Sequence, residues 1–219
     1  MTDWPEIFAA LNKWRKDLSL TEPSVTLVAE RYARDPWAVL TSTLISLRTK
    51  DEVTIKASAV LLARCKGPSD VLGASQAELE KCIYPAGFYK TKALRLREIA
   101  AILIDKYEGR VPDTLDELLA LPGVGRKTAN LVLIEAFDKD GICVDTHVHR
   151  INNRAGWLTS KSPDATELIL RDILPREYWK PINAILVLYG QRVCKPISPI
   201  CSRCVIAGHC ARKGVGKSR

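Results

Sequence analysis

The chain has 219 residues, of which 47% are hydrophobic and 26% charged, and its formal net charge is +8 at pH 7. This composition indicates a folded globular protein of one or two domains and argues against disorder, collagen and low-complexity repeats. No apolar run reaches the roughly 20 residues that a membrane helix requires. Residues 1–17 lack the features of a secretory signal and are predicted to form an amphipathic helix of a cytoplasmic protein.

Helical periodicity dominates the rest of the chain. Apolar residues recur at three- and four-residue spacing over residues 37–45, 53–62, 93–104, 115–121, 128–137 and 182–189. Thr114 and Glu117 form a predicted capping box at the start of one helix. We therefore expect an all-α protein of about ten helices with short loops, and a domain boundary near the turn cluster 138–141.

A glycine-rich turn at Gly123-Val124-Gly125 joins two of these predicted helices. Glycine lets a backbone come close to a ligand, and the helix expected to begin near Arg126 has the positive end of its dipole at this turn. With the Arg126 side chain beside it, the turn is predicted to bind phosphate. A plain helix–helix turn is the alternative for a GxG pattern, although the whole run LPGVGRKTA is far more specific.

Lys127 and Asp145 are the candidate reactive residues. Lys127 is predicted to be the second or third residue of its helix, where the helix dipole and Arg126 favour the neutral, nucleophilic amine over a solvated ammonium. Asp145 follows the extended run 142–144 and is predicted to cap the next helix. The helix after Lys127 is about 15 Å long and eight extended residues cover up to about 28 Å, so Asp145 can return beside Lys127. A cap with no further role is the alternative.

The seven cysteines fall into two groups. Single cysteines in apolar surroundings are expected to be small buried residues, namely Cys65, Cys82 and Cys143. Four others lie within 17 residues in the pattern C-x6-C-x2-C-x5-C, namely Cys194, Cys201, Cys204 and Cys210. Clustered thiolates in a cytosolic protein indicate a metal rather than disulfides. The spacing alone fits both structural zinc and an iron–sulfur cluster.

Residues 192–219 carry seven basic side chains and no acidic one. A field of one sign favours a polyanionic partner, such as nucleic acid or an anionic membrane surface, although a solvated basic tail is the simpler interpretation. Lys195 and Arg203 lie inside the cysteine-rich loop and are the candidate phosphate contacts of this segment.

The glycine turn, Lys127, Asp145 18 residues later and the four-cysteine pattern together resemble the endonuclease III family of helix-hairpin-helix DNA glycosylases. The resemblance runs from about Asp35 to Cys210 and includes the runs YPAGF and VDTH. It implies an all-α fold with a DNA cleft between two domains. These would be a six-helix barrel domain of residues 29–139, and a domain of residues 1–28 and 140–219 whose cluster loop, 194–210, binds a [4Fe–4S] cluster through the four clustered cysteines.

By this resemblance the chain is a bifunctional DNA glycosylase and abasic-site (AP) lyase that excises oxidised pyrimidines, such as thymine glycol, from duplex DNA. Lys127 would attack the sugar C1′ of a flipped nucleotide, expel the base and form a Schiff base, after which β-elimination cuts the strand 3′ to the lesion. Asp145 would stabilise the cationic sugar or activate the amine. The enzyme would be a monomer, cytoplasmic and nucleoid-associated if prokaryotic.

Two further residues are expected to act on the DNA helix. Arg48 stands where the family usually has a glutamine that fills the space left by the flipped nucleotide, and an arginine there can also hydrogen-bond the orphaned base. Phe88 stands at the position of an apolar wedge. One alternative is a monofunctional mismatch or alkylated-base glycosylase. The other is a non-catalytic helix-hairpin-helix DNA-binding protein, and the presence of both Lys127 and Asp145 argues against this second alternative.

Overall fold

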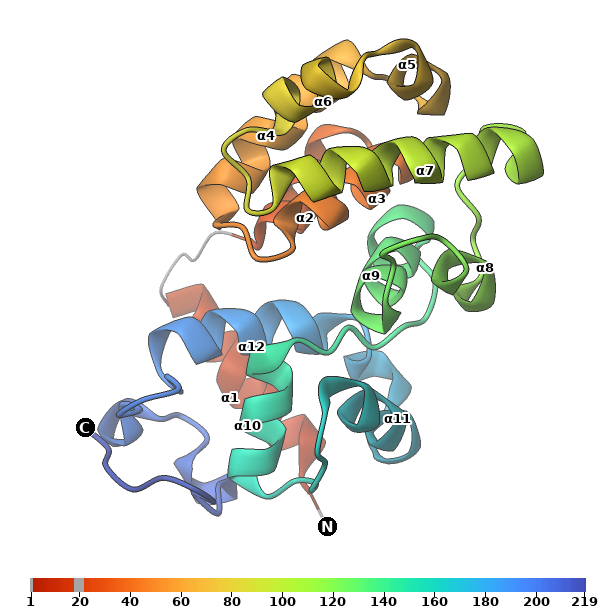
Figure 1. Cartoon of the computed structure of the whole chain (residues 1–219). Coiled ribbons are helices and arrows are strands. Elements are labelled where there is room, and N and C mark those ends of the chain that lie inside the picture. Colours follow the sequence, from red (N-terminus) through yellow and green to blue (C-terminus); the bar gives the residue numbers. More distant parts are fainter. Residues whose placement is uncertain (1, 18–21) are drawn as a thin grey trace. The chain divides into compact units, whose positions relative to one another are not determined.

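The computed structural model describes residues 2–17 and 22–219, and this part of the chain contains helices and connecting segments but no β-strand (Figure 1). The all-α prediction is confirmed. The chain divides into two compact units. Unit 1 combines the segment up to residue 22 with residues 140–219, and unit 2 is the continuous segment 23–139. None of the described helices has the length and apolarity needed to cross a membrane.

Unit 2 contains eight α-helices in its residues 23–139. They are α2 (Ser24–Arg31), α3 (Pro36–Ser46), α4 (Asp51–Arg64), α5 (Pro68–Gly73), α6 (Gln76–Ile83), α7 (Tyr89–Tyr107), α8 (Leu115–Leu119) and α9 (Arg126–Phe137). Six of the eight have at least eight residues, whereas α5 and α8 are short. The longest helix, α7, packs along α5 and α6 (Figure 1).

The start of unit 2 differs from the expected domain boundary. The sequence placed residues 23–28 with the cluster domain, but they form most of helix α2 in unit 2. The physical reason is burial, because Val25 and Val28 lie in the same apolar core as Trp37 of α3. A helix belongs with the core that covers its apolar face, and the composition of this segment gave no sign of which core that would be.

Helix α3 forms the centre of unit 2, since every residue from Trp37 to Ile45 is buried. It packs against α2, α4 and α9. Its polar residues are compatible with this burial because their hydroxyls bond to carbonyl oxygens of the preceding turn. Thr41 Oγ1 donates to Trp37 O at 2.8 Å, and Thr43 Oγ1 donates to Val39 O at 2.7 Å.

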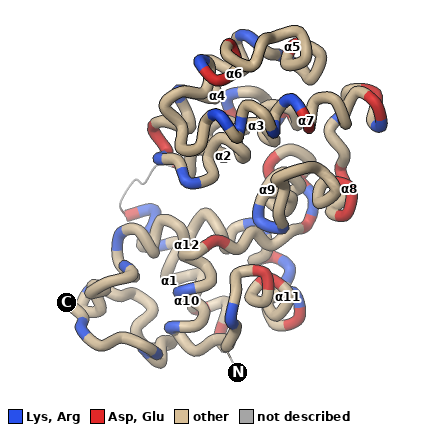
Figure 2. Tube along the Cα trace, viewed as in Figure 1, with Lys and Arg blue, Asp and Glu red and all other residues tan. Residues whose placement is uncertain are grey.

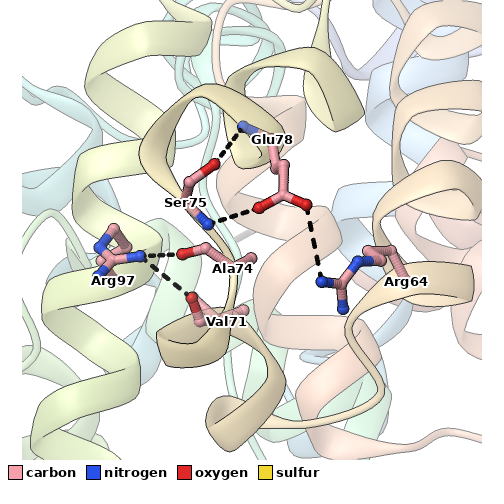
Figure 3. A network of polar contacts seen from close by, with 6 residues as sticks. All are labelled: Arg64, Val71, Ala74, Ser75, Glu78 and Arg97. Carbon is pink, nitrogen blue, oxygen red and sulfur yellow. Dashed lines mark hydrogen bonds and ion pairs between the residues drawn. The ribbon is translucent and has the colours of Figure 1, made fainter.

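A polar network joins α4, α5, α6 and α7 at one edge of unit 2 (Figure 3). Ser75 caps α6 in a complete capping box, since its side chain accepts from Glu78 N and Glu78 Oε2 accepts from Ser75 N. The two Ser75 hydrogen bonds lower the pKa of Glu78, and Arg64 of α4, 3.8 Å from its carboxylate, lowers it further. Arg97 of α7 donates to the carbonyls of Val71 and Ala74. The loop between α5 and α6 is thereby bonded on both sides.

Unit 1 contains four α-helices and three short 3₁₀ turns among its described residues. They are α1 (Trp4–Asp17), α10 (Thr146–Ala155), α11 (Pro163–Ile173), η1 (Arg176–Tyr178), α12 (Pro181–Arg192), η2 (Cys201–Arg203) and η3 (Ala207–His209). Aromatic side chains of α1 fill much of the core. Phe8 stacks on Tyr178 at 4.1 Å between ring centroids, and Trp14 meets Tyr189 edge-on at 4.8 Å.

The segment after α12 has little apolar core of its own. Val193 and Ile206 are its buried residues in the core of unit 1, and Cys194 and Cys204 pack against that core. Hydrogen bonds to α10 and to the residues that follow it hold this segment instead. Ala211 N donates to Ala155 O at 2.9 Å, and Lys213 N donates to Arg154 O at 2.8 Å. The indole of Trp157 donates to His209 O at 2.8 Å.

We predict that Ser75→Ala lowers the free energy of unfolding by about 1 kcal/mol, because the substitution removes the side-chain half of the α6 capping box. The measurement is the midpoint of urea unfolding at neutral pH. Ser69→Ala, at an exposed serine of the neighbouring helix α5, is the matched control and should change it by less than about 0.5 kcal/mol. Equal midpoints for the two variants would contradict a stabilising role for this cap.

Candidate catalytic and DNA-binding residues

The glycine turn connects α8 to α9 and presents its backbone outward. Leu121 and Val124 are buried in the core of unit 2, whereas Gly123 and Gly125 are exposed. Gly123 has φ +80°, in the left-handed region that favours glycine over residues with a Cβ atom. The two inward residues fix the turn, so the backbone between them can meet a ligand without a side chain in the way.

The helix before this turn is capped differently from the prediction. Thr114 is the N-cap of α8 and accepts from Glu117 N, as expected. The reciprocal bond of a capping box is replaced, because the Thr114 hydroxyl donates to Glu117 Oε2 at 2.5 Å. The hydroxyl thus accepts from Glu117 N and donates to the carboxylate of the same residue, in place of the bond from Thr114 N that a capping box would have.

Lys127 is the second residue of helix α9, which begins at Arg126 as predicted. The first intrahelical hydrogen bond runs from Ala129 N to Gly125 O at 2.9 Å. Lys127 therefore lies in the first turn, at the positive end of the helix dipole, and it is partly buried. A primary amine and an anion-binding helix start thus lie side by side in the sequence and in space.

Arg48 and Phe88, 40 residues apart in the sequence, are in contact in unit 2. The Arg48 guanidinium carbon lies 5.6 Å from the centre of the Phe88 ring, and both side chains are exposed. Both residues have left-handed backbone conformations, with φ +53° and +56°. They are called the wedge pair below.

A groove of about 400 Å³ connects the wedge pair to the glycine turn. It is lined by Leu44, Leu47, Arg48, Phe88, Thr91, Lys92, Arg95 and Gly123. Sequence analysis did not single out Lys92 or Arg95. Lys92 did carry a signal, because it lies four residues before Leu96 and seven before Ile99, on the apolar face of α7. Unit 2 thus brings together the predicted phosphate-binding turn and both predicted wedge residues.

Asp145 is the N-cap of helix α10 in unit 1, which confirms its predicted capping role. Its Oδ1 atom accepts from His147 N at 2.8 Å and from Val148 N at 2.9 Å. Both cap bonds use the same oxygen, and among the described residues no hydrogen bond to Oδ2 is found. The carboxylate can therefore cap the helix and still present an oxygen to a reacting group.

Three of the four clustered cysteines accept hydrogen bonds at sulfur. Arg154 Nη1 donates to Cys194 Sγ at 3.3 Å, the Tyr189 hydroxyl donates to Cys204 Sγ at 3.2 Å, and Arg212 N donates to Cys210 Sγ at 3.4 Å. Donors of this kind stabilise negatively charged sulfur, as in metal-bound thiolates. Sequence analysis missed Arg154 and Tyr189, whose sequence distances from the cysteines gave no signal.

The thiol of Cys210 is influenced by its surroundings and by the other clustered cysteines. Burial raises the pKa of the Cys210 thiol, the hydrogen bond from Arg212 N lowers it, and the charges of Cys204, Cys194 and Cys201 raise it. In the described part of the chain, no three His, Cys, Asp or Glu side chains converge on a point that could hold a single metal ion. Of the cysteines outside this loop, Cys65 and Cys143 are buried as expected, whereas Cys82 is partly buried and packs against the core of unit 2.

The C-terminal segment displays its basic residues around the cysteine loop (Figure 2). Arg203 is exposed, and Lys195 is partly buried, with its backbone carbonyl accepting from Arg154 Nη1 at 2.7 Å. His209 faces Glu6, with 3.3 Å between its Nε2 and the carboxylate.

The comparisons with known proteins define the class to which this fold and these residues belong. Residues 41–176 match the family described as HhH-GPD superfamily base excision DNA repair protein. The chain belongs to this superfamily, and it is accordingly an enzyme of base excision DNA repair.

Within that class the similarity to endonuclease III is high. The endonuclease III of Thermotoga maritima is 48% identical over 188 residues, which are 84% of this chain and 88% of that protein. The chloroplastic endonuclease III homolog 1 of Arabidopsis thaliana is 43% identical over 185 residues, which are 80% of this chain but 48% of that longer protein. A trapped endonuclease III–DNA covalent intermediate, described as an estranged-adenine complex, matches with a TM-score of 0.80 and 32% identity over 97% of both chains.

Proposed function

We propose that this chain is a bifunctional DNA glycosylase and AP lyase that removes oxidised pyrimidines from duplex DNA and cuts the strand 3′ to the resulting abasic site. The observation that carries the proposal is the primary amine of Lys127 at the start of α9, directly after the exposed backbone of Gly123 and Gly125. The relative trapped as a covalent DNA intermediate supports a nucleophilic enzyme over a purely binding protein.

In the proposed first step, the Lys127 amine attacks C1′ of a nucleotide flipped out of the duplex. The C1′–base bond breaks as the nitrogen–C1′ bond forms, and the base leaves with a proton. The C1′–O4′ bond then breaks, O4′ takes up a proton to become a hydroxyl, and the nitrogen–C1′ double bond that forms is a protonated Schiff base. Loss of a C2′ proton then breaks the C3′–oxygen bond, so the strand is cut by β-elimination.

Asp145 is proposed to assist this step through its carboxylate. A negative charge stabilises the positive charge that develops on the sugar when the base leaves, and a carboxylate oxygen can accept a proton from the attacking amine. The cap bonds to α10 use Oδ1 and hold the side chain in one orientation. Oδ2 is the oxygen proposed to act.

The DNA backbone is proposed to bind at two places. The turn at Gly123, Val124 and Gly125, with Arg126 beside it, would bind phosphates through backbone N–H groups and the helix dipole. Lys195 and Arg203 in the cysteine loop would bind phosphates through charge, without sequence preference. The proposed partner is damaged double-stranded DNA, bound by a monomer, and cytoplasmic location stays a prediction.

We further propose that Cys194, Cys201, Cys204 and Cys210 hold a [4Fe–4S] cluster. The donor set fits, because four thiols lie in one loop and hydrogen bonds from Arg154 and Tyr189 reach two of the sulfurs. The cluster would cross-link a segment that has few apolar contacts, so that metal binding and local folding are coupled. Unit 1 is then the cluster domain and unit 2 the barrel domain.

Lys127→Gln is predicted to abolish borohydride trapping, because an amide cannot form a Schiff base. The measurement uses one duplex with a thymine glycol and one with a preformed abasic site. DNA affinity should stay within about threefold of that of the unsubstituted enzyme, since no phosphate contact is removed. Lys56→Gln, at an exposed lysine of α4, is the matched control and should trap normally. A trapped adduct with the Lys127 variant would show that Lys127 is not the nucleophile. If the unsubstituted enzyme is trapped on the abasic duplex alone, its substrate is a different damaged base.

Asp145→Asn is predicted to lower the single-turnover excision rate at least tenfold (~1.4 kcal/mol), because the amide keeps the cap but removes the charge. The melting temperature should shift by less than about 2 °C. Asp35→Asn is the matched control, since Asp35 caps α3 by accepting from Ala38 N at 2.7 Å. If the Asp145 variant excises at the wild-type rate, Asp145 is only a helix cap.

Cys204→Ser is predicted to lose iron and labile sulfide, measured per chain in protein purified without oxygen, where the unsubstituted chain should hold about four of each. The partly buried Cys82, which lies in unit 2, provides the control variant Cys82→Ser, which should retain both. If the unsubstituted chain holds one equivalent of zinc and no iron, the four cysteines form a structural zinc site and the proposed cluster is wrong.

A further inference from the structure

The wedge pair is carried by two turns that contact each other through their backbones. Arg48 lies in the turn after α3, and Phe88 is the N-cap residue of α7. A Cβ atom added to Gly87 would lie 2.5 Å from Arg48 O, so no larger residue fits at this contact. The backbone of the turn before α7 is thus in direct contact with the backbone of the turn after α3.

Lys92 bonds to both turns. Its Nζ atom donates to Ile45 O at 2.7 Å, to Leu47 O at 2.6 Å and to Thr49 Oγ1 at 2.9 Å, so that oxygens on either side of Arg48 are bound to one ammonium group. Its backbone N donates to Phe88 O at 3.0 Å. The same residue thus touches the turn of each wedge residue.

Thr49 connects the two turns a second time. Its Oγ1 atom accepts from Lys92 Nζ and also from Gly87 N at 3.1 Å. Gly87 directly precedes Phe88, so this hydroxyl relates the position of the aromatic ring to the turn that carries Arg48. Lys92 and Thr49 together form a closed set of hydrogen bonds beneath the two exposed side chains.

The environment of Lys92 supports a specific role for its charge. The residue is 8% exposed, although lysine is rarely buried without a partner. Burial lowers the pKa of Lys92 to about 8. The three oxygens around Nζ use all three donors of the ammonium form. Two of them are carbonyls at the C-terminus of α3, where a positive charge is favourable.

We propose that Lys92 is a positioning residue that fixes Arg48 and Phe88 together for insertion into the DNA duplex where a nucleotide is flipped out. This inference rests on the proposed function. Lys92 makes no contact with DNA in this role and acts through the two turns. A lysine that merely stabilises the fold would affect every activity of the enzyme equally, whereas a positioning lysine affects only the steps that need the wedge pair.

The test compares Lys92→Met, which keeps the aliphatic stem, with the control Lys106→Met at an exposed lysine of the same helix. Single-turnover rates are measured on a thymine glycol duplex and on a single-stranded oligonucleotide with a preformed abasic site. The single strand has no base stack and no opposite base, so no gap in a duplex has to be filled. We expect Lys92→Met to lose about tenfold on the duplex and less than about twofold on the single strand, and Lys106→Met to lose neither. Equal losses on both substrates would overturn the proposal.

A combined variant shows whether the effect passes through the wedge pair. In a chain that already carries Arg48→Ala and Phe88→Ala, adding Lys92→Met should cause no further loss on the duplex. Multiplicative losses would mean that Lys92 acts elsewhere. If Lys92→Met does not fold, Thr49→Val replaces it, since valine has a similar shape but cannot accept from Lys92 or Gly87. The same selective loss on the duplex is then expected, and its absence would count against the proposal.

A readout without chemistry separates this inference from the proposed function. A 2-aminopurine base opposite a stable abasic-site analogue fluoresces when the enzyme displaces it. In a Lys127→Gln background, Lys92→Met should lower this signal at saturating protein, while Lys92→Arg, which retains a donor cation, should restore part of it. Failure of the unsubstituted enzyme to trap on any abasic DNA would refute the lyase function and leave this comparison intact. An unchanged signal in Lys92→Met would refute the positioning role.

Discussion

The hydrogen-bonding demand of helix ends is the constraint on which the candidate site depends. In an all-α protein the backbone groups without a partner inside their own helix are concentrated at the termini, and they must be met by side chains, water or ligands. Asp145 meets two of them at the start of α10, and Lys92 meets two at the end of α3. At the start of α9, next to the glycine turn, the proposed ligands are DNA phosphates. The residues at helix ends therefore serve the fold and the proposed site together. Phe88 is a further example, since this wedge residue is also the N-cap residue of α7.

Apolar periodicity located the long helices from sequence but not their ends. Helix α7 was predicted over residues 93–104 and runs from Tyr89 to Tyr107, because its first and last turns are largely polar and carry no periodic signal. Helix α5 has six residues, fewer than two turns, so no period could reveal it. The assignment of residues 23–28 was wrong for a different reason. A short amphipathic helix fits either of two cores, and only the packing of Val25 and Val28 decides between them.

Site features set by neighbouring residues could be predicted from the sequence, whereas contacts between residues far apart in the sequence could not. The start of α9 and the cap at Asp145 are local features, and their motifs were sufficient. The contact of Arg48 with Phe88 joins turns 40 residues apart, and the bond from Arg154 to Cys194 spans a similar distance, so neither could be deduced from spacing. Lys92 lies between these cases. Its position on the apolar face of α7 could be read from the sequence. Its hydrogen bonds could not, because they go to carbonyl oxygens at the C-terminal end of α3.

The path of the chain has a consequence for its synthesis. Unit 2 is continuous in sequence, whereas the core of unit 1 combines Trp4, Phe8 and Trp14 of α1 with residues beyond 140. As the chain leaves the ribosome, unit 2 has all of its core once residue 139 has emerged, and α1 must wait for α12 before its aromatic face is covered. The apolar face of α1 therefore stays uncovered while more than 160 further residues are made, from Asp17 to the start of α12 at Pro181. We expect the first segment to be the part of the growing chain that a chaperone binds.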